Sequence, residues 1–268
     1  MTESVDKLAE EFLHIASHLR LAILLDLHKT KTNLSTLSKK LDTTSSEIHR
    51  NLTRLTDANL IQRDSTGNYS LTTYGNMVCA NIQSWEFFLL NSKYFSKHTF
   101  GNLENNFIQS IGSLHDSKHV QGFINTQDIW KKIYKNSKQY IYNILFEVSY
   151  DSETIEIIKS QIKKGIIINS VFSKKAIISE KRKTAVDDLD IKTAIKNQQL
   201  SRKISDDVQV LVVLNENEGC VMFPKSDGDV DVSEAFYGTT KSFHDWCLAY
   251  FQSCWTKSGS FYEEKIKK

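Results

Sequence analysis

The chain has 268 residues, which is enough for two domains that each bury a hydrophobic core. Its 40% hydrophobic and 25% charged residues are ordinary for a globular protein, so a disordered chain is not expected. No apolar run is long enough to cross a bilayer, and the acidic first residues do not resemble a signal peptide. The net charge of +2 is small. These features predict a cytoplasmic protein without a membrane partner.

The cysteines and histidines do not predict a metal site. The four cysteines are widely spaced and form no C-x-x-C pair, which argues against a disulfide framework or a zinc ribbon. His14 and His18 are four residues apart, as are His115 and His119, and such a pair can hold a metal ion. No third ligand follows either pair, so we interpret these histidines as solvated or packed.

The first 60 residues carry a succession of helical patterns. Residues 5–30 contain two apolar stripes at helical spacing, which are typical of the opening helix of a small domain with an N-terminal extension. A third stripe covers 34–41, and a polar break at 42–44 precedes a helix predicted over 45–58. Thr44 and Glu47 have the spacing of a capping box. Helix, short break and helix together predict a helix-turn-helix.

The predicted helix over 45–58 has two unlike faces. Ile48, Leu52 and Leu55 form an apolar stripe, and the opposite face carries short hydrogen-bonding groups and cations. Such groups contact base edges and phosphates when a helix enters a major groove, although a solvated helix face looks similar. The candidate DNA-contacting residues of this helix are Ser45, Ser46, His49, Arg50, Thr53 and Arg54.

A β-hairpin is predicted directly after this helix. Asn59 stands where a helix end requires the left-handed conformation that Asn tolerates. Residues 60–71 then read as two short strands around a turn that contains Gly67. Helix, turn, helix and hairpin within about forty residues predict a winged helix-turn-helix. In this hypothesis Arg63, Asn68 and Tyr69 contact the DNA backbone.

Residues 34–71 resemble the winged helix-turn-helix domain of the ArsR/MarR-like transcriptional regulators, in the form common among archaeal regulators. The resemblance implies that 45–58 is the recognition helix and that 60–71 is the wing. The family usually has Gly where this chain has Asn59. Residues 31–63 carry six cationic and three acidic side chains, a net +3, so positive charge is concentrated in this segment.

The stretch after the hairpin is rich in aromatic residues. Residues 76–95 form a long apolar helical pattern that includes Trp85, Phe87 and Phe88. Two interpretations remain open, namely packing within the chain and a homodimer interface, of which the dimer is favoured because helix-turn-helix proteins commonly bind two half-sites. Residues 97–122 read as a connector.

From residue 123 the pattern changes to mixed helices and strands. A helix over 130–140, a strand over 141–149, a helix over 151–164 and a strand over 166–172 predict a βαβ unit with parallel strands. A lysine-rich helical insertion is predicted over 174–203, a hairpin over 208–223 and an amphipathic helix over 239–255. The predicted fold class is α+β, with domains at 1–96 and 123–268 joined by the connector 97–122.

The run Phe236–Trp255, with Phe243–Cys247 as its most specific part, resembles the end of the C-terminal effector domain of archaeal winged-helix regulators related to the methanogenesis-filament regulator. That resemblance implies a phospholipase D-like fold, shared with sugar-sensing TrmB-type regulators, and a ligand-sensing or assembly role. It names no ligand.

Catalytic and cofactor motifs are missing from the sequence. There is no His-x-Lys-x4-Asp motif of phospholipase D chemistry, no P-loop and no G-x-G-x-x-G. We therefore expect neither an enzyme nor a cofactor, and a divergent hydrolase is the less favoured alternative. The acidic turn at 227–231 followed by Glu234 lacks the spacing of an EF-hand, so a solvated connection is expected.

A ligand pocket, if the C-terminal domain has one, is expected at the carboxyl ends of its parallel strands by analogy with other α/β folds. Its candidate residues are Glu147, Ser149, Ser173, His244 and Asp245. Together the patterns predict a dimeric regulator that binds double-stranded DNA and responds to a small-molecule effector. The alternative is a winged helix that serves as a protein-interaction module in a larger assembly.

Overall fold

The computed structural model describes residues 2–148, 151–178 and 191–261, and it separates into two compact units, Met1–Trp85 and Glu86–Lys268. Both combine helices with antiparallel or mixed sheets, so the predicted α+β class is confirmed. The division differs from the predicted boundaries after 96 and 122, because residues 97–122 pack into the second unit. No helix in the described ranges is long and apolar enough to cross a membrane.

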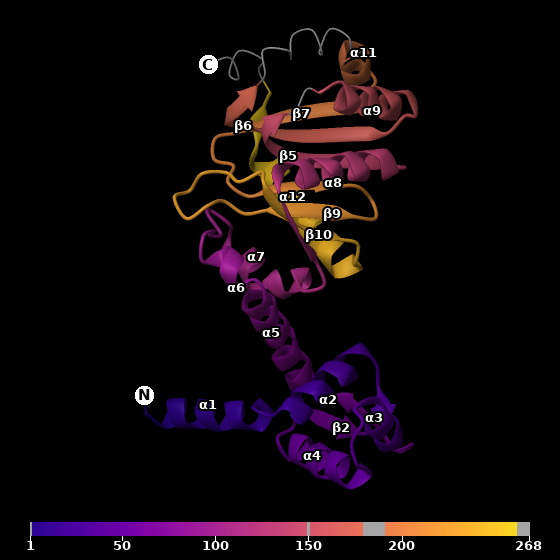
Figure 1. The fold of residues 1–268 in the computed structure, drawn as a ribbon, viewed down its shortest axis with the longest axis vertical. Helices are drawn as coiled ribbons and strands as arrows, with labels where there is room; N and C mark the ends of the chain where they lie inside the picture. Colours follow the sequence, from indigo (N-terminus) through magenta and orange to yellow (C-terminus); the bar gives the residue numbers. More distant parts are fainter. Residues whose placement is uncertain (1, 149–150, 179–190, 262–268) are drawn as a thin grey trace. The chain divides into compact units, whose positions relative to one another are not determined.

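The N-terminal unit is a winged helix-turn-helix (Figure 1). Its three short strands are all antiparallel and have the order β1-β3-β2. The elements are α1 (Thr2–Ile15), α2 (His18–Lys29), β1 (Thr32–Asn33), α3 (Leu34–Lys40), α4 (Ser45–Asp57), β2 (Ile61–Arg63), β3 (Asn68–Leu71) and α5 (Thr73–Leu90). The predicted helices and hairpin are confirmed, and the short β1 was not predicted.

The core of this unit is built by the apolar stripes that the sequence shows. Ile23 and Leu24 of α2, Leu37 of α3 and the buried stripe of α4 pack together in one cluster. Removing each such aliphatic side chain from water contributes roughly 1.5–3 kcal/mol to the free energy of folding of this small domain. Cys79 of α5 belongs to the same core, where burial raises the pKa of its thiol to about 11.

The C-terminal unit is built around one eight-stranded sheet with the order β11-β7-β6-β5-β8-β9-β10-β4. Strands β5, β6 and β7 run parallel, and the other neighbours are antiparallel. The strands are β4 (Lys118–Gln121), β5 (Tyr140–Val148), β6 (Ile167–Ile178), β7 (Leu200–Ser205), β8 (Leu211–Leu214), β9 (Gly219–Met222), β10 (Glu234–Gly238) and β11 (Gly259–Ser260).

Helices cover both faces of this sheet. The helical elements are α6 (Ser92–Phe95), α7 (Asn105–Gln109), η1 (Ile111–Leu114), α8 (Phe123–Asn136), α9 (Ser152–Lys163), α11 (Ile191–Lys196) and α12 (Lys241–Lys257). Helices α8 and α9 lie on one face and α12 on the other (Figure 1). Neighbouring side chains of β5 point to opposite faces of the sheet, since Asn143 contacts Tyr134 of α8 and Tyr142 stacks on Phe251 of α12.

Two predictions for this unit differ from the structure. The lysine-rich segment expected to be helical over 174–203 is helical at α11, but it begins as strand, since β6 continues to Ile178, and it ends in β7; residues 179–190 lie outside the described residues. The expected connector 97–122 contains the edge strand β4 and buries Leu103, Phe107 and Ile111 in the core. The βαβ unit, the hairpin β8–β9 and the last helix are confirmed.

Candidate nucleic-acid interface

The helix-turn-helix is held by local hydrogen bonds at each helix start. The Asn33 side chain accepts a bond from the Thr36 amide at 3.0 Å, and the Thr44 hydroxyl accepts one from the Glu47 amide at 3.2 Å. The Glu47 carboxylate accepts a bond from the Thr43 hydroxyl at 3.0 Å and does not reach back to the Thr44 amide, so only half of the predicted capping box forms. Asp42 adopts a positive φ of 46° in the turn.

Helix α4 separates its residues by face as predicted. Ile48, Leu52 and Leu55 are buried, whereas the candidate DNA-contacting residues on the opposite side are all exposed. Those exposed residues are Ser45, Ser46, His49, Arg50, Thr53 and Arg54. Asn59 ends the helix with a φ of 55°, which confirms the predicted left-handed position. The helix therefore presents a polar, cationic face to solvent.

Two arginines on this face are free to take an outside partner. Neither Arg50 nor Arg54 forms an ion pair with any residue in the described ranges. They are one helical turn apart, so both guanidinium groups project from the same side. The hydroxyl of Thr53 bonds back to the His49 carbonyl at 3.0 Å, which fixes its position on the same face.

The wing is organised by one carboxylate. Asp64 accepts bonds from the amides of Thr66 and Asn68, both at 2.9 Å, and from the Thr66 hydroxyl at 2.6 Å. The hydroxyl and the two amides hold the pKa of Asp64 below its usual value. Gly67 completes the turn with a φ of 85°, a conformation that favours glycine.

Of the three predicted wing contacts, Arg63 is exposed and Asn68 is half-buried, with its side-chain amide bonded to Thr66. The prediction for Tyr69 is wrong, because its side chain packs in the core and is only 8% exposed. The guanidinium of Arg63 lies 5.7 Å from the centre of the Tyr69 ring. Tyr69 is therefore better placed to hold Arg63 in position than to contact DNA.

Two of the predicted pocket residues, His244 and Asp245, lie away from the others that the structure describes. His244 Nε2 lies 3.0 Å from the hydroxyl of Tyr140, at the first residue of β5. Glu147 is seven positions further along β5, roughly 23 Å away at the rise of an extended strand. His244 and Asp245 therefore lie at the opposite end of the strand from Glu147. Ser173 is buried, and Ser149 and the Glu147 side chain lie outside the described residues.

The long helix α5 divides its aromatic residues between two environments. Phe87 and Phe88 belong to the core of the C-terminal unit, which agrees with the packing interpretation. Trp85 is 51% exposed and lies 5.6 Å from Phe12 of α1. It borders a groove of about 190 Å³ between α1 and α5 within the N-terminal unit. The groove is lined by Leu8, Glu11, Phe12, Ile15, Leu60, Tyr74, Val78, Asn81, Ile82 and Trp85.

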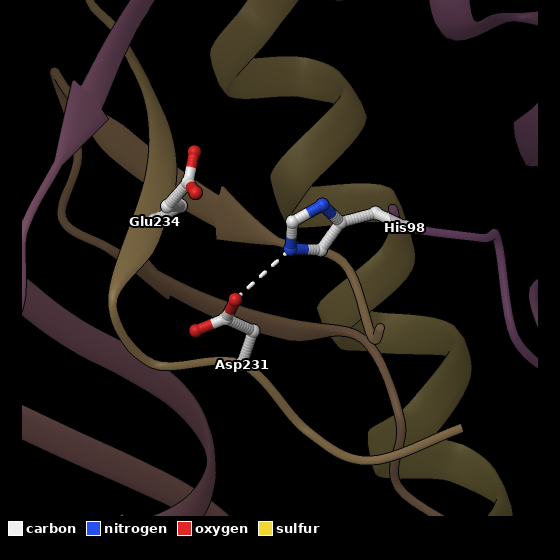
Figure 2. A group of neighbouring side chains, drawn as sticks. All are labelled: His98, Asp231 and Glu234. Atoms are coloured by element: carbon white, nitrogen blue, oxygen red, sulfur yellow. Dashed lines mark hydrogen bonds and ion pairs between the residues drawn. The ribbon is translucent and has the colours of Figure 1, made fainter. Parts of the chain in front are cut away.

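The acidic turn before β10 is not a simple solvated connection. Asp231 is only 6% exposed, and its Oδ2 lies 2.9 Å from His98 Nε2 (Figure 2). His98 precedes Asp231 by more than 130 residues, so no spacing rule relates them. The expectation of a solvated turn is thus wrong for Asp231, and His98 was missed altogether.

Comparisons with known families and structures give one family match and several structural matches. Residues 9–87 match the family described as the HVO_A0261 N-terminal domain. A search of curated proteins finds no match. The family match contains the whole helix-turn-helix and wing, and the ArsR/MarR-like assignment stays a prediction.

Among solved structures, the chain is similar to TrmBL2, described as an archaeal chromatin protein with a novel mode of DNA binding. That match has 12% identity and a TM-score of 0.40, and it covers 86% of this chain and 88% of TrmBL2. A phospholipase D family member, Nuc from Salmonella typhimurium, has 9% identity and a TM-score of 0.40 over 55% of this chain and 97% of its own. NucT from Helicobacter pylori has 8% identity and a TM-score of 0.35, with 55% and 100% covered.

Proposed function

We propose that this protein is a DNA-binding transcription regulator of the archaeal winged-helix kind, in which α4 enters the major groove and the wing contacts the phosphate backbone. The observation that carries the proposal is the exposed face of α4. On this face Arg50 and Arg54 form no ion pair with a described residue. A helix that buries one face and offers paired cations and hydroxyls on the other fits the major groove.

The charge of the first unit supports the same proposal. Residues 31–63 carry a net +3, whereas the whole chain carries +2, so the remaining residues are close to neutral. Phosphate contacts depend on such local positive charge, and they make DNA affinity fall steeply with salt. Arg63 is the last residue of β2 and adjoins the turn of the wing, where a phosphate contact would orient the domain on the duplex.

The test is DNA binding by the full chain, measured by fluorescence anisotropy on the DNA upstream of its own gene and on a scrambled duplex. We expect tight binding with a steep salt dependence. Arg50→Ala should cost about 1–3 kcal/mol on the specific duplex if it contacts a base, and should weaken both duplexes equally if it contacts only phosphate. The double variant Arg50→Ala/Arg54→Ala should also lower the salt slope by about 2, one for each lost phosphate contact.

A matched control removes the same charge elsewhere. Lys163 and Lys164 are exposed at the end of α9 and form no ion pair with a described residue. The variant Lys163→Ala/Lys164→Ala should bind DNA as the parent protein does. Equal loss in both double variants would show only a net-charge effect. A folded protein that binds neither duplex at any salt concentration would instead favour the protein-interaction module.

We further propose that the regulator is a homodimer formed through α1 and α5 of the N-terminal unit. The groove between these helices is apolar, and Leu8, Met77 and Trp85 on them are more than half exposed. Single exposed hydrophobic residues are ordinary, but several around one groove are typical of an interaction surface. Trp85→Glu should convert a dimer to a monomer in light scattering, and Phe123→Glu, an exposed aromatic residue of α8, should not.

The role of the C-terminal unit in ligand sensing stays a prediction, since His244 and Asp245 lie at the opposite end of β5 from Glu147, and Ser149 lies outside the described residues. We propose no catalytic activity for it, because the sequence has no His-x-Lys-x4-Asp motif. A screen for phosphodiester hydrolysis by the purified chain checks that proposal, and turnover above background would overturn it.

A further inference from the structure

His98 lies at a crossing of three chain segments in the C-terminal unit. Its backbone forms a bridge with Lys225, flanked by bonds from the Thr99 amide to the Pro224 carbonyl at 2.9 Å and from the Ser226 amide to the Lys97 carbonyl at 2.8 Å. The segment after α6 is thereby fixed beside the loop that follows β9. The His98 ring points from this bridge toward the turn before β10 (Figure 2).

The ring of His98 is held in one orientation. Its Nδ1 lies 2.9 Å from the Tyr94 carbonyl, and the Tyr94 ring stacks on it with centroids 3.7 Å apart and planes within 6°. A carbonyl oxygen only accepts hydrogen bonds, so Nδ1 carries a proton. A neutral ring protonated there presents an unprotonated Nε2. Metal-binding histidines are commonly oriented in this way, with the second nitrogen donating to a backbone carbonyl.

The other ring nitrogen of His98, Nε2, faces a carboxylate. Asp231 Oδ2 lies 2.9 Å from His98 Nε2, while Oδ1 of the same carboxylate accepts bonds from the Ser233 amide at 2.7 Å and the Ser233 hydroxyl at 2.6 Å. An imidazole nitrogen and a carboxylate oxygen are both ligands of transition-metal ions, and here they already lie side by side in a buried place.

A third potential metal ligand lies beside this pair. Glu234, the first residue of β10, places a carboxylate oxygen so that it, Asp231 and His98 have donor atoms all within 4.8 Å of one another. Two zinc bonds of about 2.0–2.2 Å that meet at a tetrahedral angle separate their donors by roughly 3.4 Å, so modest side-chain rotation closes the site.

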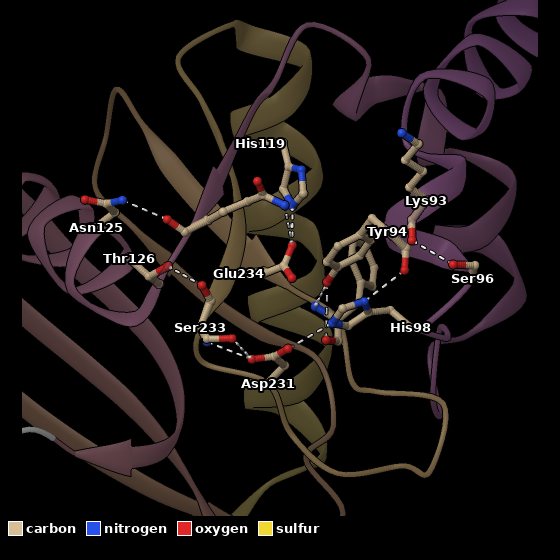
Figure 3. A network of polar contacts seen from close by, with 12 residues as sticks. Lys93, Tyr94, Ser96, His98, His119, Asn125, Thr126, Asp231, Ser233 and Glu234 are labelled. Carbon is tan, nitrogen blue, oxygen red and sulfur yellow. Dashed lines mark hydrogen bonds and ion pairs between the residues drawn. The ribbon is translucent and has the colours of Figure 1, made fainter.

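The Glu234 carboxylate is held by side chains of β4. His119 Nε2 lies 2.8 Å from Glu234 Oε2 (Figure 3), and the side-chain amide of Gln121 donates to the same oxygen at 3.3 Å. The His119 ring is held against Phe236, with centroids 5.0 Å apart. His98 and Asp231 are nearly fully buried, whereas the side chains of His119 and Glu234 are about a quarter exposed at 25% and 26%. A metal ion therefore has a route from solvent on the Glu234 side.

We propose that His98, Asp231 and Glu234 form a binding site for one divalent transition-metal ion of the zinc class, with His119 next to its solvent-facing side. Imidazole nitrogen with two carboxylates suits zinc and its neighbours, whereas Ca²⁺ and Mg²⁺ take oxygen ligands. The site ties the segment after α6 to β10, next to the edge strand β4, so its role is structural. It is independent of the DNA-binding proposal.

The test is zinc binding by the full chain after removal of metals with a chelator, followed by calorimetry and metal analysis. We expect one Zn²⁺ per chain, a rise in thermal stability with zinc, and no comparable response to Mg²⁺. Glu234→Gln should weaken zinc binding at least about tenfold, because it removes a ligand near the surface with little effect on packing. His98→Gln and Asp231→Asn should also abolish the site, but Glu234→Gln decides the outcome if those variants do not fold.

The matched control is His115→Gln, because His115 Nε2 forms a second histidine–acid pair in the same unit, 3.2 Å from Asp116, without a third ligand among the described residues. It should bind zinc as the parent protein does. Co²⁺ in place of zinc should give visible bands without the near-ultraviolet absorption of a thiolate ligand, which separates this site from metal held by a cysteine. No zinc binding, or unchanged binding by Glu234→Gln, would overturn the proposal.

Discussion

The two units of the chain use their polar side chains in opposite ways. In the N-terminal unit, Arg50 and Arg54 stand in solvent with no ion pair to a described residue. In the C-terminal unit, buried groups such as Asn215 and His98 are surrounded by hydrogen-bond partners. An exposed unpaired cation adds little to folding and is available to an outside partner, whereas a buried polar group must be satisfied internally. The first arrangement suggests recognition and the second suggests a fixed tertiary structure.

A large loss of stability is expected when a buried polar side chain of the C-terminal unit is removed. Asn215 is fully buried; its amide donates to the Ile133 carbonyl at 2.7 Å, and its carbonyl oxygen accepts from the amides of Asn217 and Glu218. Asn215→Ala leaves these groups without partners and should lower the free energy of unfolding by about 2–4 kcal/mol. Denaturant unfolding measures this, and the exposed Asn217→Ala is the control. If both variants lowered the free energy of unfolding equally, burial of Asn215 would not explain its effect.

An intermediate, local effect is expected in the wing. The pKa of Asp64 is lowered by bonds from Thr66 and Asn68, so its carboxylate stabilises the folded turn above the unfolded pKa of about 3.9. That contribution is lost as pH falls through the lower, folded pKa. Amide chemical shifts of Thr66 and Asn68 should therefore titrate together at a pH below about 3.9. The variant Asp64→Asn should remove the titration, and an unchanged profile would contradict the bonds seen in the turn.

The smallest effect on stability is expected from the exposed arginines. Arg50→Ala/Arg54→Ala should change the free energy of unfolding by no more than about 0.5 kcal/mol, because both side chains lie on the solvent face of α4. The neighbouring Leu52→Ala, on the buried face of the same helix, should cost about 2–5 kcal/mol. Thermal melts of the two variants compare them directly. Strong destabilisation by the arginine changes would mean that these residues support the fold.

Local patterns predicted much of the N-terminal unit. The helix-turn-helix follows from a helical period, a capping hydroxyl at Thr44 and a left-handed Asn59, and each of these acts over a few residues. The exposed face of α4 followed from the same period. Tyr69 was misplaced because alternation along a short strand does not say which face the core covers. In the structure β3 packs against α2, and this contact puts the Tyr69 side chain on the buried face of the strand.

The sequence by itself determined the elements that short-range physics specifies: the helices, the wing, and the parallel pair β5–β6 with its crossover helix α9. Only the tertiary structure decided which distant segments meet. His98, Asp231 and Glu234 come together because β10 and β4 form one end of the sheet and the segment after α6 crosses there. His244 was placed at the wrong end of the sheet for the same reason, since it contacts Tyr140 at the start of β5 and not its end. Strand order and helix packing depend on the whole core, and no spacing along the chain encodes them.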